Sequence, residues 1–288
     1  MALMISRLRF LQLAVAVVIA AGCASVRYFA DDEQCEIHFI DVGYGDAILV
    51  KLGRATFCVD GGYPPMASVV LEYFQRAGVD RLDALIVTHP HPDHIGGAYG
   101  ILQSGFQVES VYCSYGLNDP EMPEGFVKLI ESKISRGELT FNTVADGDRV
   151  ILSENRWLDV VSPKTMHPDM NESSLALHFH GIGKGVLLTG DIGAHAQEHL
   201  IRAHPEIFPV TVLKAPHHGG SALEEFYRLA SPAVTIISDG INPYDNPKKE
   251  TLEMLKRWSE TTIRLSKAGS VVVTGISGGA ARIQRGFR

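Results

Sequence analysis

The chain has 288 residues, of which 45% are hydrophobic and 20% are charged, so it can form one large α/β domain or two small ones. Its formal net charge of −7 at pH 7 does not favour general electrostatic capture of nucleic acid, although it leaves room for a small cationic groove. Twelve histidines are many for this length, and four of them lie in two tight clusters, His89 with His91 and His217 with His218.

A targeting segment is predicted at residues 1–23. Arg7 and Arg9 give it a positive flank, residues 10–21 form a short apolar run, and small residues lead into Cys23. The run is short for a transmembrane helix and suits a secretory signal. Its end resembles a bacterial lipoprotein signal, so we expect an extracytoplasmic protein that is anchored to the membrane by a lipid on Cys23. A cleaved secreted protein and an uncleaved helical anchor are the alternatives.

Residues 24–34 are predicted to form a linker, and residues 35–288 a single domain. Strands are predicted at 36–42, 47–51, 55–59, 84–87, 107–113, 175–180, 186–189, 210–214, 234–238 and 270–274, with a hairpin at 146–161. Helices are predicted at 66–77, 98–102, 125–135, 195–203, 223–229 and 248–259. Because the strands come in runs that helices follow, we predict an α/β (α+β) four-layer domain with two packed sheets between helices. Cys35, Cys58 and Cys113 lack CxxC spacing, which disfavours a cysteine-rich zinc site but leaves a disulfide open.

Three histidines and one aspartate fall within six residues: His89, His91, Asp93 and His94. An apolar strand precedes them and a short helix follows, so the cluster is predicted to lie on a strand-to-helix turn, where side chains converge on a cleft. Neutral imidazoles together with a carboxylate are ligands of zinc, manganese or iron. The sequence therefore predicts a transition-metal site at this turn.

Other polar residues also directly follow apolar strands: Asp41, Asp60, Asp191, His217 and His218. Side chains at several strand ends gather on one edge of an α/β fold and build a site there. A carboxylate has two oxygens, so Asp191 could bridge two metals roughly 3.5–4 Å apart. Adjacent residues in an extended chain point to opposite sides, so we expect one of His217 and His218 to bind metal. The other could orient a ligand or contact the leaving group.

Five motifs carry a family resemblance: Asp41-Val42-Gly43-x-Gly45-Asp46-Ala47, Thr88-His89-x-His91-x-Asp93-His94-x-Gly96-Gly97, Asn171-x-x-Ser174-Leu175, Leu188-Thr189-Gly190-Asp191-Ile192 and Leu213-Lys214-x-Pro216-His217-His218-Gly219. Together they resemble the metallo-β-lactamase superfamily, and within it the hydrolase domain of the ComEC competence proteins and its stand-alone relatives. The resemblance spans roughly residues 35–288. It implies an αββα sandwich and two divalent metal ions, zinc or manganese.

The resemblance also implies roles for the site residues. His89 and His91 would bind the first metal, and Asp93 and His94 the second. The remaining expected ligands are Asp191, His217 and His218. Asp93, His218 and Asn246 are the expected catalytic residues, and the ligands would be supported from behind by Asp41, Asp46, Asp60, Asn171 and Lys214.

The chain departs from the family pattern at several positions. Tyr44 and Gly220 replace the usual glutamine and serine, and Asn246 replaces a histidine, which puts the last ligand or proton donor in question while leaving a hydrogen-bonding side chain. The third histidine of the first metal has no clear counterpart. His167 and Asn171 are nearby candidates for it, whereas His178 and His180 are expected to be ordinary strand residues.

The predicted function is metal-dependent hydrolysis by a metal-activated water, with a phosphodiester as substrate and DNA as one candidate. One alternative is a non-catalytic extracytoplasmic lipoprotein that binds a ligand through a degenerate metal site. Another is a lactonase or β-lactamase-type hydrolase. No protein partner is predicted.

Overall fold

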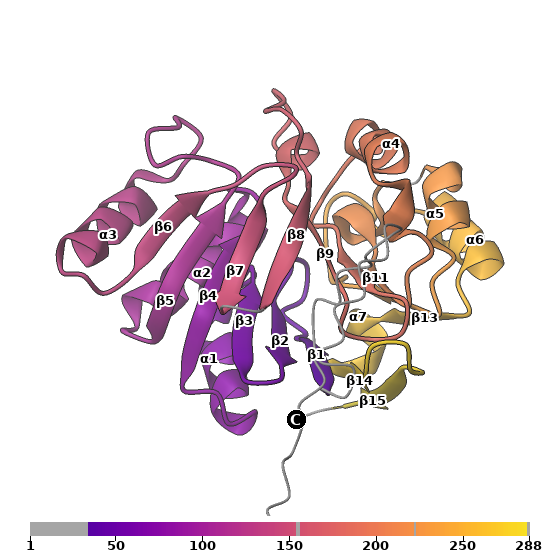
Figure 1. The fold of residues 1–288 in the computed structure, drawn as a ribbon, viewed down its shortest axis with the longest axis horizontal. Helices are drawn as coiled ribbons and strands as arrows, with labels where there is room; N and C mark the ends of the chain where they lie inside the picture. The colour runs from indigo at the N-terminus through magenta and orange to yellow at the C-terminus, as the bar shows by residue number, and fades with distance from the viewer. Residues whose placement is uncertain (1–33, 154–155, 222, 287–288) are drawn as a thin grey trace, which may run out of the picture.

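The computed structural model describes residues 34–153, 156–221 and 223–286 and contains two mixed sheets (Figure 1). The first sheet has the strand order β15-β14-β1-β2-β3-β4-β5-β6. Its strands are β1 (Cys35–Phe39), β2 (Ile48–Leu52), β3 (Ala55–Val59), β4 (Arg81–Val87), β5 (Gln107–Cys113), β6 (Thr140–Thr143), β14 (Val271–Gly275) and β15 (Arg282–Arg285). The second sheet has the order β13-β12-β11-β10-β9-β8-β7. Its strands are β7 (Arg149–Ser153), β8 (Arg156–Ser162), β9 (Ala176–Phe179), β10 (Val186–Leu188), β11 (Val212–Lys214), β12 (Val234–Ile237) and β13 (Thr261–Arg264).

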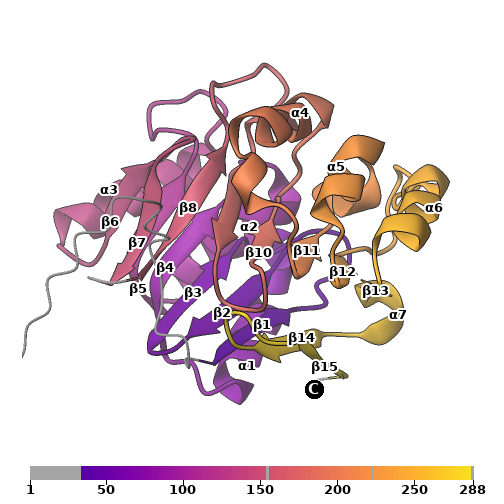
Figure 2. The same cartoon turned by 45° about the vertical axis from the view of Figure 1, so that its right-hand side comes forward.

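Three apolar cores hold four layers together. The central core lies between the two sheets, where Phe57 of β3 meets Phe179 of β9 with ring centroids 5.9 Å apart. A second core joins the first sheet to α1 (Ala67–Arg76), α2 (Pro92–Gln103) and α3 (Glu124–Ser135). The third joins the second sheet to α4 (Ala194–Ala203), α5 (Glu224–Ala230) and α6 (Lys249–Trp258), which lie side by side in Figures 1 and 2. The predicted four-layer arrangement is therefore confirmed.

Most predicted elements are present with ends that shift by one to three residues, but three strands were not predicted. β6, β13 and β15 each lie at the edge of a sheet, and β15 is exposed throughout. An edge strand has one unpaired side and carries more polar residues, so it shows little apolar alternation in sequence. The expectation that residues 270–274 form the last strand was wrong for this reason.

The helix after the histidine cluster is longer than predicted. It begins at Pro92, so Asp93 and His94 belong to its first turn and not to the preceding loop. Proline suits the first helical position, since that position needs no donor, and a carboxylate there is favoured by the helix dipole. The helix therefore fixes the spacing of these two side chains.

Two sequence expectations concern the chain ends and the cysteines. The predicted signal segment and Cys23 lie outside the described residues. Within the described part, no helix has the length and apolar character needed to cross a bilayer.

Cys35, Cys58 and Cys113 are buried free thiols, so no disulfide forms among these three residues.

Candidate metal centre

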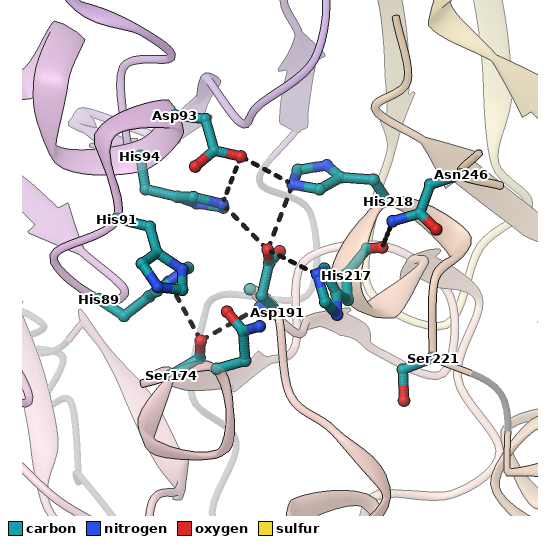
Figure 3. A network of polar contacts seen from close by, with 12 residues as sticks. His89, His91, Asp93, His94, Ser174, Asp191, His217, His218, Ser221 and Asn246 are labelled. Carbon is teal, nitrogen blue, oxygen red and sulfur yellow. Dashed lines mark hydrogen bonds and ion pairs between the residues drawn. The ribbon is translucent and has the colours of Figure 1, made fainter. Parts of the chain in front are cut away.

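Four buried side chains point their polar atoms at one another (Figure 3). Asp191 Oδ2 lies 3.2 Å from His94 Nε2 and 3.3 Å from His218 Nε2. Asp93 Oδ2 faces the same two nitrogens at 3.7 and 3.5 Å. Two carboxylates and two imidazoles around one point are a ligand set for a transition metal.

The four side chains come from both sheets and meet where the sheets adjoin. Asp93 and His94 follow β4 of the first sheet, on α2. Asp191 follows β10, and His218 follows β11, two neighbouring parallel strands of the second sheet. The expectation that polar side chains at strand ends gather at one edge of the fold thus locates the site.

The outer nitrogens of the two imidazoles have fixed partners. His94 Nδ1 lies 2.8 Å from Asp60 Oδ2, and His218 Nδ1 lies 2.8 Å from the carbonyl oxygen of Ser238. Such contacts keep a proton on Nδ1 and turn the lone pair of Nε2 inward, as in metal-binding histidines. Both Nε2 atoms are buried and face carboxylate oxygens at 3.2–3.7 Å, but they lack hydrogen-bond geometry to any described residue. Inward-facing nitrogens of this kind fit a metal ion.

The surrounding charges favour a cation. Asp46, Asp60, Asp93 and Asp191 are buried here. The buried ammonium of Lys214 lies 2.6 Å from Asp46 Oδ2 and 3.3 Å from Asp191 Oδ1, and it donates to the carbonyl oxygen of Gly190 at 2.8 Å. One lysine cannot balance four carboxylates, and each buried charge needs a partner.

The pKa shifts of the site residues reflect the same excess of buried negative charge. Burial opposes the charged form of His218, but Asp191 outweighs it and raises the pKa of this histidine to about 9. Burial likewise opposes protonation of His94, yet the carboxylates of Asp191 and Asp60 raise its pKa well above the usual value. Burial alone would raise the pKa of Asp191, but His218, His94 and Lys214 lower it well below normal. Protons and metal ions compete for such a site.

His89 and His91 form a less complete pair beside this group, with the ring centroids of His89 and His94 4.2 Å apart. His89 Nε2 lies 2.9 Å from His91 Nδ1, while Ser174 Oγ contacts His89 Nδ1 at 3.1 Å (Figure 3). Neither histidine belongs to a group of three or more close ligand atoms of His, Cys, Asp or Glu among the described residues. The buried Oδ1 of Asn171 has no hydrogen-bond partner there, and Asn171 lines the same cleft as His91.

The remaining expected residues separate into near and distant ones. His217 is half-buried, with Nε2 4.0 Å from Asp191 Oδ2, so it flanks the group that His218 completes. Both histidines have left-handed backbone conformations (φ 50° and 54°), so the assumed extended chain was wrong, and both rings turn Nε2 towards Asp191 Oδ2. His167 lines a different pocket, and Asp41 accepts a hydrogen bond from the amide of Gly43 within its own turn.

The family can now be assigned. Residues 40–238 match the family described as the metallo-beta-lactamase superfamily. The chain belongs to the metallo-beta-lactamase superfamily. The chain is 30% identical over 264 residues to ComE operon protein 3 of Bacillus subtilis, and this match covers 82% of the chain and 32% of that protein. It is 25% identical over 277 residues to competence protein ComA of Neisseria gonorrhoeae, with coverages of 94% and 36%. The chain spans about a third of the length of these curated relatives.

Solved structures support the fold of this superfamily. The metallo-beta-lactamase fold protein YhfI from Bacillus subtilis matches with a TM-score of 0.53 and 16% identity, over 88% of this chain and 100% of that one. Unliganded yeast PDE1 matches with a TM-score of 0.50 and 12% identity, over 81% and 97%. At these identities the likeness shows the fold alone.

Tyr44 and Asn246, two positions at which the chain departs from the family pattern, lie together. Asn246 Nδ2 donates to Tyr44 Oη at 3.1 Å, and the Tyr44 ring packs on His218 with centroids 4.3 Å apart. Both residues line a cleft of about 560 Å³ that also exposes Asp93, Asp191 and His217. The two replacements thus form one contact at the wall of the cleft.

Sequence reasoning assigned no role to Ser238, Thr88 or Ser174. Ser238 directly follows β12, so it lies at a strand end as the other site residues do. The sequence could not show that its backbone carbonyl oxygen contacts His218 Nδ1. Thr88 Oγ1 donates to Asp60 Oδ2 at 2.8 Å, and Ser174 Oγ accepts from the amide of Asp191 at 3.2 Å. Each ties parts of the site together across long stretches of sequence.

Proposed function

We propose that this protein is a metal-dependent phosphodiester hydrolase that uses two divalent ions, zinc or manganese. The observation that carries the metal-dependent part is the pair of buried Nε2 atoms of His94 and His218, which face two carboxylates and lack hydrogen-bond geometry to any described residue. The His89 and His91 pair is proposed to hold the second ion more weakly, because it has fewer ligands.

The chain's own residues have distinct proposed roles at the cleft. Divalent ions held there would supply Lewis-acid chemistry, which lowers the pKa of water and stabilises negative charge on oxygen. Asp93 and Asp191 hold and orient this centre, and Asp60 fixes the ring of His94. His217 lies at the cleft wall, where burial lowers its pKa, so it is neutral near pH 7 and can contact the leaving group. Asn246 lines the cleft and donates from Nδ2 to Tyr44 Oη, so its proposed role is to position that hydroxyl group beside the substrate.

A phosphodiester substrate is supported by the cleft lining and by the relatives. Lys248, Tyr63 and Tyr244 line the cleft and offer a cation and hydroxyl donors to a phosphate. Two of the matched relatives are named competence protein ComA, in Neisseria gonorrhoeae, and recombination protein 2, in Haemophilus influenzae. These names point to DNA as one substrate, whereas the lactam and lactone alternative draws no comparable support from the described residues.

Metal analysis combined with a substrate panel tests this function. The purified chain would be assayed with zinc and manganese on bis(4-nitrophenyl) phosphate, single-stranded DNA, a β-lactam and a lactone, beside an Asp93→Asn variant. We expect phosphodiester turnover that Asp93→Asn reduces on the order of 10²-fold or more. Metal binding without turnover of any substrate would favour the non-catalytic binding protein.

Membrane attachment through Cys23 is a separate proposal, supported by the residues that precede it. The expected result is that Cys23→Ser releases or mislocalises the protein, as read from fractionation of expressing cells. Retention of full-length Cys23→Ser protein in the membrane fraction would favour an uncleaved helical anchor.

A further inference from the structure

A second group of metal-ligand side chains lies beside α4. It contains Asp146, in the loop between β6 and β7, and two histidines near the end of α4. His199 Nε2 lies 2.7 Å from Asp146 Oδ2, and His204 Nε2 lies 2.6 Å from Asp146 Oδ1. The three side chains are 14–19% exposed, so solutes can reach them. None of the three lines the cleft of the candidate metal centre.

Backbone hydrogen bonds hold the three residues in place. The amide of Asp146 donates to the carbonyl oxygen of Pro163 at 2.9 Å, and that of Gly147 donates to the carbonyl oxygen of Val160 at 3.0 Å. The amide of His204 donates to the carbonyl oxygen of Leu200 at 3.0 Å and closes the last turn of α4. A preorganised set of ligands loses little entropy on binding an ion.

His204 has a carboxylate beside each ring nitrogen. Its Nε2 faces Asp146, and its Nδ1 lies 3.4 Å from Glu206 Oε1. In a metal-bound state Glu206 would hold the proton on Nδ1 and Nε2 would bind the ion, the usual arrangement of a metal-bound histidine.

The surroundings of the group are rich in acids and histidines. The adjoining hollow of about 220 Å³ is lined by, among others, Asp148, Asp159, His178, His180, His204 and Glu206. Two nearby arginines already have acidic partners: Arg149 lies 3.2 Å from Asp159, and Arg202 lies 3.7 Å from Glu198. The local charge thus favours a cation.

We propose that Asp146, His199 and His204 bind one divalent transition-metal ion of the zinc class. Two imidazoles and one carboxylate suit such an ion, with water in any open position. The ion would tie the C-terminal end of α4 to the loop before β7. Since α4 begins three residues after Asp191, it would also steady the segment that leaves the candidate metal centre.

Metal titrations of the full chain separate this site from the other. In the background of Asp191→Asn, which disables the candidate metal centre, zinc is titrated into chelator-treated protein while stoichiometry and the midpoint of thermal unfolding are followed. We expect one equivalent to remain and to raise the midpoint. Adding Asp146→Asn, or His204→Gln in a parallel variant, should weaken this equivalent by about 100-fold or more and abolish the thermal shift.

His195→Gln is the matched control, because His195 is an exposed histidine on the same helix, four residues before His199. It should bind zinc as the parent does. In the wild-type background, Asp146→Asn should remove one equivalent and leave the proposed hydrolysis intact. Unchanged stoichiometry in folded Asp146→Asn and His204→Gln proteins, checked by circular dichroism, would show that the three residues share only protons and would overturn the proposal.

Discussion

At the scale of single residues, Asp191 is the side chain on which the candidate metal centre most depends. Its carboxylate faces His94 and His218 (Figure 3). Its other oxygen lies 3.3 Å from Lys214 Nζ. Asp191→Ala should remove metal from this centre and lower turnover on the order of 10³-fold, because several kcal/mol of Lewis-acid stabilisation are lost. Elemental analysis and phosphodiester kinetics measure both effects. Asp41→Asn is the control, since Asp41 accepts a hydrogen bond within its own turn; equal losses in both variants would contradict the role of Asp191.

Lys214 compensates buried negative charge. Its side chain is fully buried, and its pKa is raised because the nearby carboxylates of Asp46 and Asp191 outweigh the cost of burial. Lys214→Met should destabilise the metal-free protein by about 3–5 kcal/mol, since Asp46 is left as an unpaired buried charge. Urea unfolding measures the loss.

A second substitution provides the control for Lys214→Met. Adding Asp46→Asn removes the unpaired charge, so the double variant should recover part of the stability. No recovery would mean that the loss came from packing around the lysine stem and not from charge.

The sequence predicted the identities of the site residues better than their geometry. The residue types at strand ends sufficed to select His94, Asp191 and the pair His217 and His218. They could not show that both adjacent histidines face Asp191, because that depends on left-handed backbone angles that residue type alone does not predict. The distant Asp146 group was also not predicted, since Asp146 lies more than 50 positions from His199 and His204 in sequence.

At the scale of elements, the packing of α2 against the turn after β3 sets the position of His94. The amide of Gly97 donates to the carbonyl oxygen of Gly62 at 2.7 Å, and the amide of Gly61 donates to that of His94 at 3.0 Å. A Cβ atom on Gly97 would lie 1.7 Å from the carbonyl oxygen of Gly61, so only glycine fits there.

Gly97→Ala should therefore push α2 away from the turn. We expect a loss of about 3 kcal/mol or more in the free energy of unfolding, together with weaker metal binding, because Asp93 and His94 move with the helix. Gly116→Ala is the matched control, since its nearest neighbour, Thr143 Oγ1, would be 3.8 Å from the new Cβ. Wild-type metal affinity in Gly97→Ala would show that the ligands do not depend on this contact.

Elements were predictable from sequence where they carry apolar residues that become buried. β3 and β5 were predicted with their observed ends, because β3 is a largely buried apolar run and β5 ends in the buried residues Val-Tyr-Cys. β6 and β15 were not predicted, since their sequences, Thr-Phe-Asn-Thr and Arg-Ile-Gln-Arg, are largely polar. Their pairing is determined by the neighbouring strand, which local sequence does not report.

At the scale of the whole molecule, acid should destabilise the fold partly through one histidine of β9. Burial, assisted by the nearby His180 and His204, lowers the pKa of His178 to about 3, so it is neutral in the folded protein. Unfolding restores its usual pKa, and the unfolded chain then binds more protons below pH 6.5. Stability is therefore lost as pH falls from 6.5 towards 3, by about 2 kcal/mol at pH 5 from this group.

His178→Gln tests this linkage in metal-free protein. The loss of unfolding free energy between pH 7 and pH 5, measured in urea, should be about 2 kcal/mol smaller in the variant. Exposed His195 supplies the control, and His195→Gln should follow the wild-type profile. Identical pH profiles for His178→Gln and wild type would contradict the assignment.

The ligands of the candidate metal centre come from both sheets, so an ion bound there would join the two halves of the sandwich. Asp93 and His94 belong to one half of the molecule, and Asp191 and His218 to the other. An ion present at 1,000 times its dissociation constant would stabilise the closed sandwich by about 4 kcal/mol, a large part of the 5–15 kcal/mol typical of a domain. The lifetime of the folded protein would then follow the metal supply of its surroundings, and a cell starved of that metal would lose the protein along with its activity.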